Sequence, residues 1–336
     1  MPSPVRLVSV AAALPEQVWS SDDVDAKIAA SSPGYRHRRG VLESISGVRT
    51  RRVAEDHEQC SDLAVRAAQR ALADAGLSPH DVEVLVFAAA SQDLLEPATA
   101  HIVQHKLGTA CQVFDVKNAC NSFLNGLQLA EALILTGSCE TALVVTGEIC
   151  SRGIPWQVTD FDDFKRKFPA FTMGDAGAAA VLQRSTDGRG IFYRRFASLS
   201  EHWPLATIPG GGSMHPRGDE HTFLRADGPR LKQAFIDLGP AIFERMMREA
   251  GVSFCDFARV LVHQASVPYL EEMLARVGLP SGLVEHTVGD LGNVASASLP
   301  VAYARAVARG AIRPGDRVMW LGLASGMSVG LILIDV

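Results

Sequence analysis

The chain has 336 residues, of which 47% are hydrophobic and 21% are charged, and its formal net charge is −5 at pH 7. A chain of this length can bury a substantial core, as two domains or one large layered unit, and its composition is that of a folded globular protein. The excess of acidic over basic residues argues against a nucleic-acid-binding protein, which normally presents a basic face.

Neither the N-terminus nor the cysteines indicate export. Residues 1–15 contain one Arg and a short apolar run before Pro15, so we expect a first β-strand rather than a signal peptide. The six cysteines form no C-x-x-C pair, and no apolar stretch reaches the roughly 20 residues that cross a bilayer. We therefore expect a cytoplasmic protein with free thiols, no bound metal and no membrane association.

Apolar periodicity predicts alternating helices and buried strands along the first half of the chain. In chain order these elements are a helix at 63–76, a strand at 82–91, a helix at 99–108, strands at 112–118 and 141–148, a short amphipathic helix at 161–168 and a strand at 176–183. Continuous β-branched runs flanked by helices indicate strands buried on both faces, so we expect mostly parallel sheets covered by helices.

The second half repeats this plan. Its predicted elements are a helix at 242–251, a strand at 259–266, a helix at 268–278 and strands at 316–323 and 329–336. Both copies run helix, Ala-Gly, Leu or Val, Ser, a short acidic linker and a buried strand, followed by a second helix. Turn residues after residue 186 break the pattern. The sequence therefore predicts two similar α/β halves, residues 1–186 and 187–336.

Cys120 lies where a predicted strand ends and an amphipathic helix begins, in the sequence FDVKNACNSFLNG. At a helix N-terminus, unpaired N–H groups and the positive end of the dipole favour the thiolate, which is the nucleophilic form of cysteine. A neighbouring N–H is also placed to bind the oxyanion that forms when a carbonyl is attacked. The alternative at this point is a small buried core cysteine.

Two polar residues of the second half are further candidates. His263 ends the predicted strand in ARVLVHQAS, at the carboxyl edge where α/β sheets usually place their sites. Asn293 lies in the Gly-rich turn of GDLGNVASAS. Taken singly, His263 is equally compatible with a structural histidine, and Asn293 with a turn residue that tolerates an unusual backbone angle.

In combination, the motifs NAC-x-x-F, HQAS, GN-x-x-S-A-S-x-P and the terminal LGLASGMSVG resemble the β-ketoacyl synthase III family of condensing enzymes along the whole chain. The resemblance implies an α/β thiolase fold, in which two similar halves form five αβαβα layers. It implies that Cys120 accepts the acyl group, with His263 and Asn293 facing it. It also implies an oxyanion hole made by the N–H groups of Cys120 and Ser325. Many relatives carry Gly where this loop has Ala324 and Ser325, but a backbone donor tolerates that change.

The chemistry of acyl transfer suits these residue types. A thioester on Cys120 keeps an electrophilic carbonyl, so condensation is divided into two easier steps. Neutral His and Asn donors aimed at the oxygen of a second thioester stabilise its enolate without a metal.

The segment SQDLLEPATAHIVQHKLG (91–108) resembles one particular group within this family. LEP-x-TA is similar to a group that contains the olefin-pathway enzymes, which join two fatty acyl thioesters head to head, and the α-pyrone synthases, which fuse two β-ketoacyl chains. In that group the matching Glu reaches the partner subunit's active site and removes an α-proton, which implies the same role for Glu96. A carboxylate in an apolar pocket has a raised pKa and suits this task. The alternative is a Glu before Pro97 that interacts with a helix dipole.

The donor and the acyl tunnel can be predicted in outline. Relatives that use coenzyme A commonly clamp its adenine between a Trp and an Arg, where this chain has Val41 and Ile45. The resemblance therefore implies a donor on an acyl carrier protein. Candidate contacts for an acidic carrier are Arg49, Arg51, Arg52 and the basic run 165–167. Candidate tunnel residues are Phe123, Phe164 and Trp203.

We therefore predict a homodimeric ketosynthase that needs no cofactor beyond the phosphopantetheine that carries its substrates on acyl carrier protein or coenzyme A. Its reaction would be a Claisen condensation of two acyl or β-ketoacyl thioesters, in polyketide, α-pyrone or related metabolism. The first alternative is a conventional decarboxylative 3-oxoacyl synthase III that uses malonyl carrier protein. An O- or N-acyltransferase of this fold and a non-catalytic docking protein are the others.

Overall fold

In the computed structural model, which describes residues 4–336, the apolar runs of the sequence form two separate sheets. The first has the strand order β1-β7-β6-β4-β5 and the second β11-β12-β13-β8. The strands of the first sheet are β1 (Val5–Ala13), β4 (Val84–Ala88), β5 (Gln112–Val116), β6 (Thr141–Ile149) and β7 (Asp175–Arg184). Those of the second sheet are β8 (Ile191–Ser198), β11 (Arg259–Val262), β12 (Arg317–Ala324) and β13 (Ser328–Asp335). The predicted boundary after residue 186 falls in the connection between the two sheets.

The two sheets repeat one order and one pattern of strand directions. The series β1-β7-β6-β4 corresponds to β8-β13-β12-β11: in each, two antiparallel pairings are followed by a parallel one. In the first sheet β4 also pairs in parallel with β5. At the corresponding position of the second sheet, β11 forms only a parallel bridge between Val260 and Val284. The expectation of mostly parallel sheets was therefore wrong. In the second half the physical reason is plain, because β13 follows β12 through a short turn that only an antiparallel pair can use.

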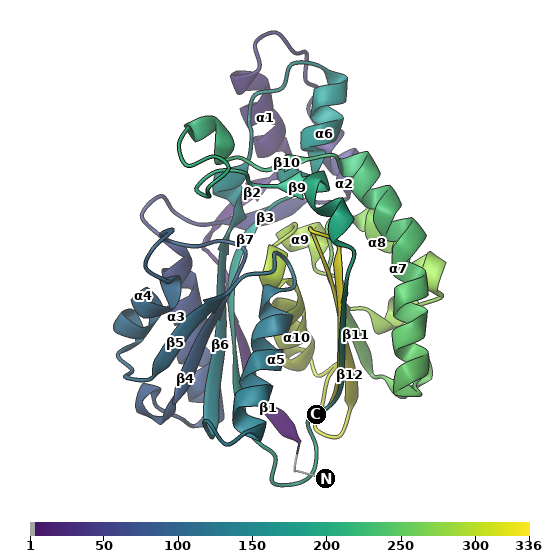
Figure 1. Cartoon of the computed structure of the whole chain (residues 1–336). Helices are drawn as coiled ribbons and strands as arrows, with labels where there is room; N and C mark the ends of the chain where they lie inside the picture. The colour runs from purple at the N-terminus through teal and green to yellow at the C-terminus, as the bar shows by residue number, and fades with distance from the viewer. Residues whose placement is uncertain (1–3) are drawn as a thin grey trace.

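Helices cover both faces of each sheet and produce five layers (Figure 1). Outside the first sheet lie α3 (Cys60–Ala75) and α4 (Thr99–Leu107), and outside the second lie α7 (Gly228–Ala250) and α8 (Val267–Val277). Between the sheets lie α5 (Ser122–Leu135) and α10 (Ser298–Ala308). Their apolar side chains meet Trp320 of β12 in a central core, where Leu124 and Ala302 are fully buried.

The repeated linker has the same structure in both halves. Helices α3 and α7 each end at a glycine with positive φ, 68° at Gly76 and 65° at Gly251, where a side chain would be strained. The next turn is then capped by a Ser and an Asp. The Asp81 carboxylate accepts from the backbone N–H of Ser78, and that of Asp256 from Ser253, both at 2.7 Å. The short acidic linker seen in the sequence is thus a helix stop followed by a capped turn.

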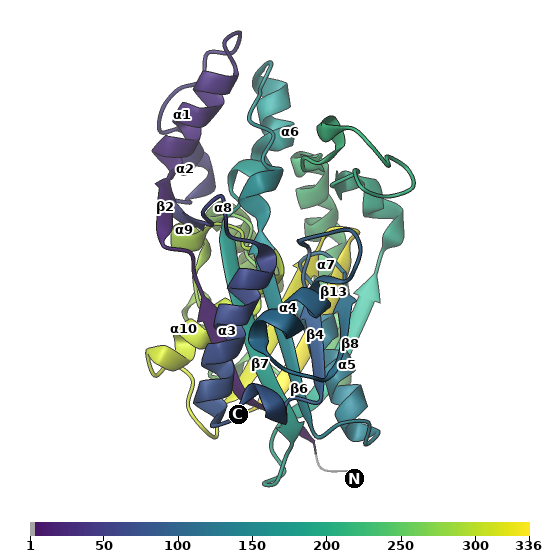
Figure 2. The same ribbon diagram turned by 90° about the vertical axis from the view of Figure 1, so that its left-hand side faces the viewer.

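A further group of elements projects beyond one end of the sheets, and we call it the cap (Figures 1 and 2). It consists of α1 (Ser21–Ser31), α2 (Val41–Ser46), α6 (Phe161–Phe171) and the two-stranded pairs β2 (Gln17–Ser20)–β3 (Thr50–Val53) and β9 (Ala206–Thr207)–β10 (Arg225–Ala226). The cap has its own small core, which includes Val24, Ile28, Leu42 and the buried aromatic rings of α6. Within residues 4–336, no helix combines the length and the apolar character needed to cross a membrane.

Candidate active site

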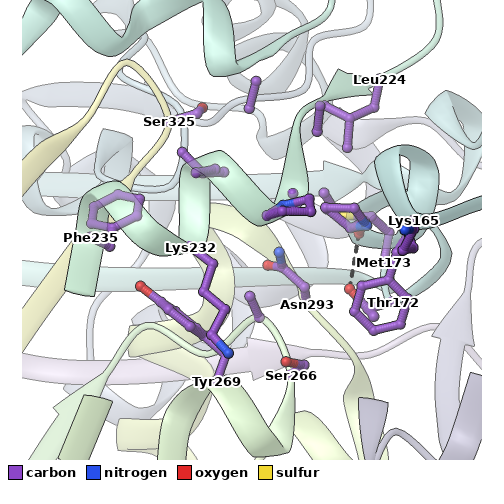
Figure 3. Close-up of a pocket in the computed structure, with 18 of the residues that line it drawn as sticks. Lys165, Thr172, Met173, Leu224, Lys232, Phe235, Ser266, Tyr269, Asn293 and Ser325 are labelled. Carbon is purple, nitrogen blue, oxygen red and sulfur yellow. Dashed lines mark hydrogen bonds between the residues drawn. The ribbon is translucent and has the colours of Figure 1, made fainter. Parts of the chain in front are cut away.

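A cavity of about 450 Å³ opens between α6 of the cap and α7, and the candidate residues meet at its inner end. Cys120, His263, Asn293 and Ser325 all line it. Figure 3 shows Asn293 between Thr172 and Met173 on one side and Lys232 and Phe235 on the other. The two halves of the chain therefore contribute to one site.

Cys120 is held on a sharp turn between β5 and α5. Ala119, directly before it, has a φ of 47°, and the Ser122 hydroxyl donates to the Ala119 carbonyl at 2.7 Å while accepting from the Asn118 N–H at 2.8 Å. Desolvation, with a smaller contribution from the carboxylate of Glu148, raises the pKa of the Cys120 thiol to about 12. The expected preference for a thiolate at the helix N-terminus is thus outweighed by burial, and the resting side chain is a neutral thiol at pH 7.

His263 comes directly after β11 and is buried. Its backbone N–H donates to the Leu321 carbonyl at 3.0 Å, which extends the pairing of β11 with β12 by one residue. Burial lowers the pKa of the imidazole to about 4, so the ring is neutral at pH 7. Nδ1 has no hydrogen-bond partner among the described residues. A neutral ring can donate one hydrogen bond into the cavity without carrying a charge.

Asn293 is fixed by both its backbone and its amide oxygen. Its N–H donates to the Thr172 carbonyl at 2.8 Å, and its own carbonyl accepts from the Gly174 N–H at 3.0 Å. The side-chain Oδ1 accepts from the backbone N–H of Ala295 at 3.0 Å. This contact assigns the orientation of the amide and leaves Nδ2 as the donor for the cavity.

Ser325 lies in the turn between β12 and β13 and, like Cys120, lines the cavity. The two are linked through Asn121, whose Nδ2 donates to the carbonyl and the hydroxyl of Ser328 at 3.1 and 2.9 Å. Because Asn121 follows the thiol and Ser328 begins β13, this contact holds the backbone of Cys120 and the turn of Ser325 in a fixed relation.

Backbone strain is concentrated around these residues. Within residues 4–336, the non-glycine residues with positive φ are Ala119, Ala295 and Met327, at 47°, 46° and 51°. Each lies within two residues of Cys120, Asn293 or Ser325. Such conformations cost of order 1–3 kcal/mol and persist where the surrounding structure holds them, most often at functional sites.

Glu148, at the end of β6, was not singled out from the sequence. Its fully buried carboxylate accepts from the N–H groups of Ala90 and Ser91, at 2.8 and 2.9 Å, and from the hydroxyl and N–H of Ser296. It therefore ties the loop after β4 to the turn that follows Asn293. The signal in the sequence was a carboxylate at the end of the apolar run TALVVTGE, because an unpaired charge is rarely buried.

The remaining predicted residues lie in different surroundings. Phe164 lines the cavity. Phe123 and Trp203 are not part of its lining: Phe123 stacks on Trp320 in the central core with ring centroids 6.3 Å apart, and Trp203 is 50% exposed. Glu96 is exposed and lies outside the cavity of its own chain. Arg51 is only 1% exposed, so it is unsuited to contacting a carrier protein.

The described residues contain no cluster of side chains suited to binding a metal ion. Within residues 4–336, no group of three or more His, Cys, Asp or Glu side chains is arranged to hold a metal ion. The polar atoms at the inner end of the cavity are instead a thiol, an imidazole and a carboxamide.

Two family models match the chain: 3-oxoacyl-[acyl-carrier-protein] synthase III over residues 114–198 and the C-terminal part of the same enzyme over residues 247–336. The β-ketoacyl-[acyl-carrier-protein] synthase III of Symbiobacterium thermophilum is 32% identical, with 98% of each chain covered. That of Neisseria gonorrhoeae is 30% identical over 96% of each chain.

Solved structures of the same kind superpose over the whole chain. OleA from Xanthomonas campestris, crystallised with lauric acid and lauroyl-CoA, has a TM-score of 0.88 and 26% identity, and the match covers 100% of both chains. FabH, a 3-oxoacyl-(acyl carrier protein) synthase III from Xanthomonas oryzae, gives the same TM-score, identity and coverage. The predicted thiolase fold is thereby confirmed.

Proposed function

Because the chain belongs to the β-ketoacyl-[acyl-carrier-protein] synthase III family of condensing enzymes, we propose that it joins two acyl thioesters without decarboxylation, through an acyl group on Cys120. The observation that carries this proposal is a cavity lined both by a thiol from the first half and by neutral hydrogen-bond donors from the second. The likeness to OleA, a head-to-head condensing enzyme, supports the non-decarboxylative form.

In the first step the Cys120 sulfur attacks the carbonyl of the first thioester, and the thiol proton leaves with the departing thiol. The N–H groups of Cys120 and Ser325 stabilise the oxyanion of the tetrahedral intermediate, a contribution typically of 10²–10³ in rate for one such donor. The high pKa of the thiol means that its proton is lost during the attack and not before it.

In the second step an α-proton is removed from the second thioester, and Nδ2 of Asn293 and the imidazole N–H of His263 hold the enolate oxygen. The low pKa of His263 keeps the ring a neutral donor that stabilises the enolate without protonating it. The enolate carbon attacks the Cys120 thioester, and the thiolate leaves and regains a proton. The product is a β-ketoacyl thioester, or a thioester with three keto groups if both chains already carry a β-keto group.

Glu96 is the proposed base, supplied by a second copy of the chain. Its loop is anchored at the first-sheet edge strand β5, where the Asp115 carboxylate accepts from the N–H groups of Thr99 and Ala100, both at 2.8 Å. Beside Glu96 the loop presents Leu94 and Leu95, which are 51% and 68% exposed. An exposed apolar tip next to an unpaired strand edge suits insertion into a partner subunit.

The thioester donor is proposed to be an acyl carrier protein. Ile45 lines the cavity in a position where a coenzyme A clamp would need a side chain that binds adenine. Lys165 lines the cavity as well, and its neighbour Arg166 is exposed, so the basic run 165–167 lies where an acidic carrier would dock. Because a structure of OleA contains bound lauroyl-CoA, coenzyme A thioesters can serve as substrates in the test of this proposal.

A decarboxylative synthase is the second candidate, since the relatives with 30–32% identity bear that family's name. Such an enzyme obtains its carbanion by loss of carbon dioxide from a malonyl group, so it does not need Glu96. The two candidates therefore differ in what Glu96→Gln does.

The test incubates the purified protein with acyl or β-ketoacyl thioesters, with and without malonyl thioester, and follows products and protein mass. We expect condensation without malonyl, and we expect Glu96→Gln to acylate Cys120 normally but to lose condensation by at least tenfold. Glu140→Gln is the matched control. Glu140 is exposed and directly precedes the first residue of β6, so this variant should behave as wild type. Product that appears only with malonyl, in wild type and Glu96→Gln alike, would establish the decarboxylative reaction instead.

A further inference from the structure

The buried carboxylate of Glu148 joins two segments that serve different sites in the proposed reaction. One segment is the loop of residues 89–98, which carries Glu96 and which we call the base loop. Oε1 of Glu148 accepts from the N–H of Ala90 at 2.8 Å, and Oε2 accepts from the next N–H along the base loop at 2.9 Å. Oε1 also accepts from the hydroxyl of Ser296, and from its N–H at 3.3 Å. One oxygen atom is thus bonded both to the start of the base loop and to the turn of Ser296.

The turn that contains Ser296 belongs to the candidate active site of its own chain. Asn293 lies three residues before Ser296, and its Oδ1 accepts from the N–H of Ala295 at 3.0 Å. The negative charge of Glu148 also acts on the Cys120 thiol, because it contributes to the raised pKa of that group. Glu148 is therefore linked by hydrogen bonds and by its charge to the catalytic centre of the chain in which it lies.

The base loop is held by carboxylates at both of its ends. At the start its backbone donates to Glu148, and at the far end the backbone of the first turn of α4 donates to Asp115. Between them, Asp93 accepts from the N–H of Ser61 in α3 at 3.0 Å. Glu96 follows on the exposed part of the loop. Of these anchors, Glu148 is the one that also bonds the turn after Asn293, so it fixes the base loop relative to a catalytic centre.

A carboxylate suits this place because its two oxygens only accept, and the four groups that meet it are three N–H groups and a hydroxyl. Glutamine has nearly the same shape, but its NH2 group cannot accept. Glu148→Gln therefore turns a donor toward a donor and leaves at least one buried N–H without a partner. The base loop and the Ser296 turn are then no longer held by one side chain.

We propose that Glu148 is a positioning residue for the reaction in the partner subunit: it holds the base loop so that Glu96 reaches the α-carbon of the thioester bound there, and it couples this position to the Ser296 turn of its own site. This inference deepens the proposed function and rests on it, since it requires that Glu96 act across the dimer. The two sites of one dimer then depend on each other through Glu148.

Dimers made of two different chains test this inference. The chains carry different affinity tags, are expressed together and are purified through both tags. The first, the acylated chain, keeps Cys120 and carries Glu96→Gln. The second, the base-supplying chain, carries Cys120→Ala and keeps Glu96. Only the site of the acylated chain can then react, and its base comes from the other chain. Acyl or β-ketoacyl thioesters are the substrates, and both condensation and the mass of acylated Cys120 are measured.

Glu148→Gln is then placed in one chain at a time. In the base-supplying chain it should lower the kcat of condensation at least tenfold, because a displacement of about 1 Å can cost on the order of 10²-fold. Acylation of Cys120 and the KM of the second thioester should stay within about twofold. Because the base-supplying chain has no nucleophile, this loss cannot arise in its own site. In the acylated chain the same substitution should lower condensation by about threefold at most, since the backbone of Asn293 stays bonded to Thr172 and Gly174.

Ser296→Ala carries the test if Glu148→Gln does not fold, because it keeps the carboxylate and removes only the hydroxyl that meets it. In the base-supplying chain it should lower condensation by about two- to fivefold, which a change in that chain's unreactive site could not do without the link to the base loop. Glu131→Gln is the matched control, at a buried carboxylate paired with Arg194. It should leave condensation unchanged in either chain. Thermal melting and native mass spectrometry show whether each mixed dimer is folded and intact.

Three outcomes in folded mixed dimers would overturn the inference: equal losses from Glu148→Gln in either chain, a loss only from the acylated chain, or no loss from either. A failure of the proposed function looks different, since dimers with Glu96→Gln in both chains would then condense as well as wild type. Inactive mixed dimers beside an inactive Glu96→Gln protein would show that Glu96 serves its own chain. That result would overturn the role of Glu148 and leave the reaction without decarboxylation standing.

Discussion

The two halves of the molecule share one scaffold and differ in what they place at the site. Helices α5 and α10 both lie between the sheets, and an alanine with positive φ, Ala119 or Ala295, precedes each. In the first half the thiol of Cys120 directly follows this alanine, whereas in the second half the amide of Asn293 lies two residues before it. A strained alanine thus lies beside a nucleophile in one half and close to a hydrogen-bond donor in the other.

The strands that precede these helices differ in the same way. Strand β11 leads directly to His263 in the cavity, whereas its counterpart β4 leads to a loop that carries Glu96 away from its own cavity. In the proposed mechanism the first half carries the acyl group and provides a base to the partner subunit, while the second half stabilises the enolate. The two halves thus have similar backbones, and different side chains at similar places give them different roles in the reaction.

The largest expected effect is that of Cys120→Ala, which removes the proposed acyl acceptor of the first half. No mass increase should appear after incubation with any acyl thioester, and condensation should fall at least about 10³-fold, as when other covalent nucleophiles are removed. Cys255→Ala, at an exposed cysteine, is the control and should be acylated as wild type. An acyl group retained by Cys120→Ala would place the nucleophile elsewhere.

Asn293→Ala tests the contribution of the second half. Since Asn293 is proposed to act only on the enolate, acylation of Cys120 should stay within a few-fold of wild type. Turnover should fall by about 10²–10³, the usual effect of losing one such donor. Rapid-quench mass spectrometry separates the two steps, and thermal melting shows whether the variant is folded. Equal losses in both steps would show that the halves do not divide the reaction.

The burial of His263 should be visible in the pH dependence of stability. The folded pKa of about 4 lies below the ordinary value of 6.5, so the unfolded chain takes up this proton first as the pH falls. Stability attributable to this residue is therefore lost between about pH 6.5 and pH 4. The loss reaches about 3 kcal/mol, at 1.4 kcal/mol for each pKa unit.

Urea unfolding of wild type and His263→Gln at pH 7 and at pH 4 measures this difference. The free energy of unfolding of wild type should fall toward that of the variant at the lower pH, because glutamine does not titrate. A difference between the two proteins that is the same at both pH values would mean that the imidazole is hydrated in the folded state.

Glu148→Gln tests whether the buried carboxylate of β6 raises the pKa of Cys120. The carboxylate raises the pKa of Cys120, so its removal should lower that pKa and increase iodoacetamide alkylation several-fold between pH 8 and pH 9. Glu131→Gln, at a buried carboxylate that pairs with Arg194, is the matched control and should leave the alkylation profile unchanged. A profile moved to higher pH would contradict the assigned direction.

Much of the scaffold could be predicted because its strands are buried on both faces. The runs that form β4, β6, β7, β12 and β13 are nearly continuous apolar segments, and the repeat between the halves identified their order. Strand β8, with the sequence IFYRRFAS, was missed because it is an edge strand with two arginines and partial exposure. The first turns of α7 were missed as well, since Gly228, Pro229 and Pro240 interrupt the helical pattern.

The residues of the candidate site were likewise predictable only in part. Cys120, His263 and Asn293 were found because each lies in a local motif, and the structure brings them to one cavity. Residues whose surroundings depend on distant packing were not predictable in this way. Phe123 turns toward Trp320 of the other half, and Arg51 is buried against the carbonyl of Phe171 at 3.1 Å. Local pattern specifies the backbone turn, but which long-range neighbour a side chain meets is decided by the assembled layers.

The smallest expected effect is that of Ala295→Gly, and it addresses the strained turn that the halves share. An alanine in the left-handed region is disfavoured by about 1–2 kcal/mol, while glycine increases the entropy of the unfolded chain by about 0.4–1 kcal/mol. The free energy of unfolding should therefore stay level or rise by up to about 1 kcal/mol. Turnover should fall a few-fold, because a freer turn holds Oδ1 of Asn293 less firmly at the Ala295 N–H.

Ala302→Gly is the matched control for Ala295→Gly, since it makes the same change inside α10, where φ is helical. There glycine should cost about 1 kcal/mol or more and leave the ratio of acylation to turnover unchanged. Denaturant unfolding and single-turnover kinetics on both variants separate strain from packing. If both substitutions destabilise the protein equally, the positive φ of Ala295 is not strained, and the strained turns do not explain how the two halves hold Cys120 and Asn293 in place.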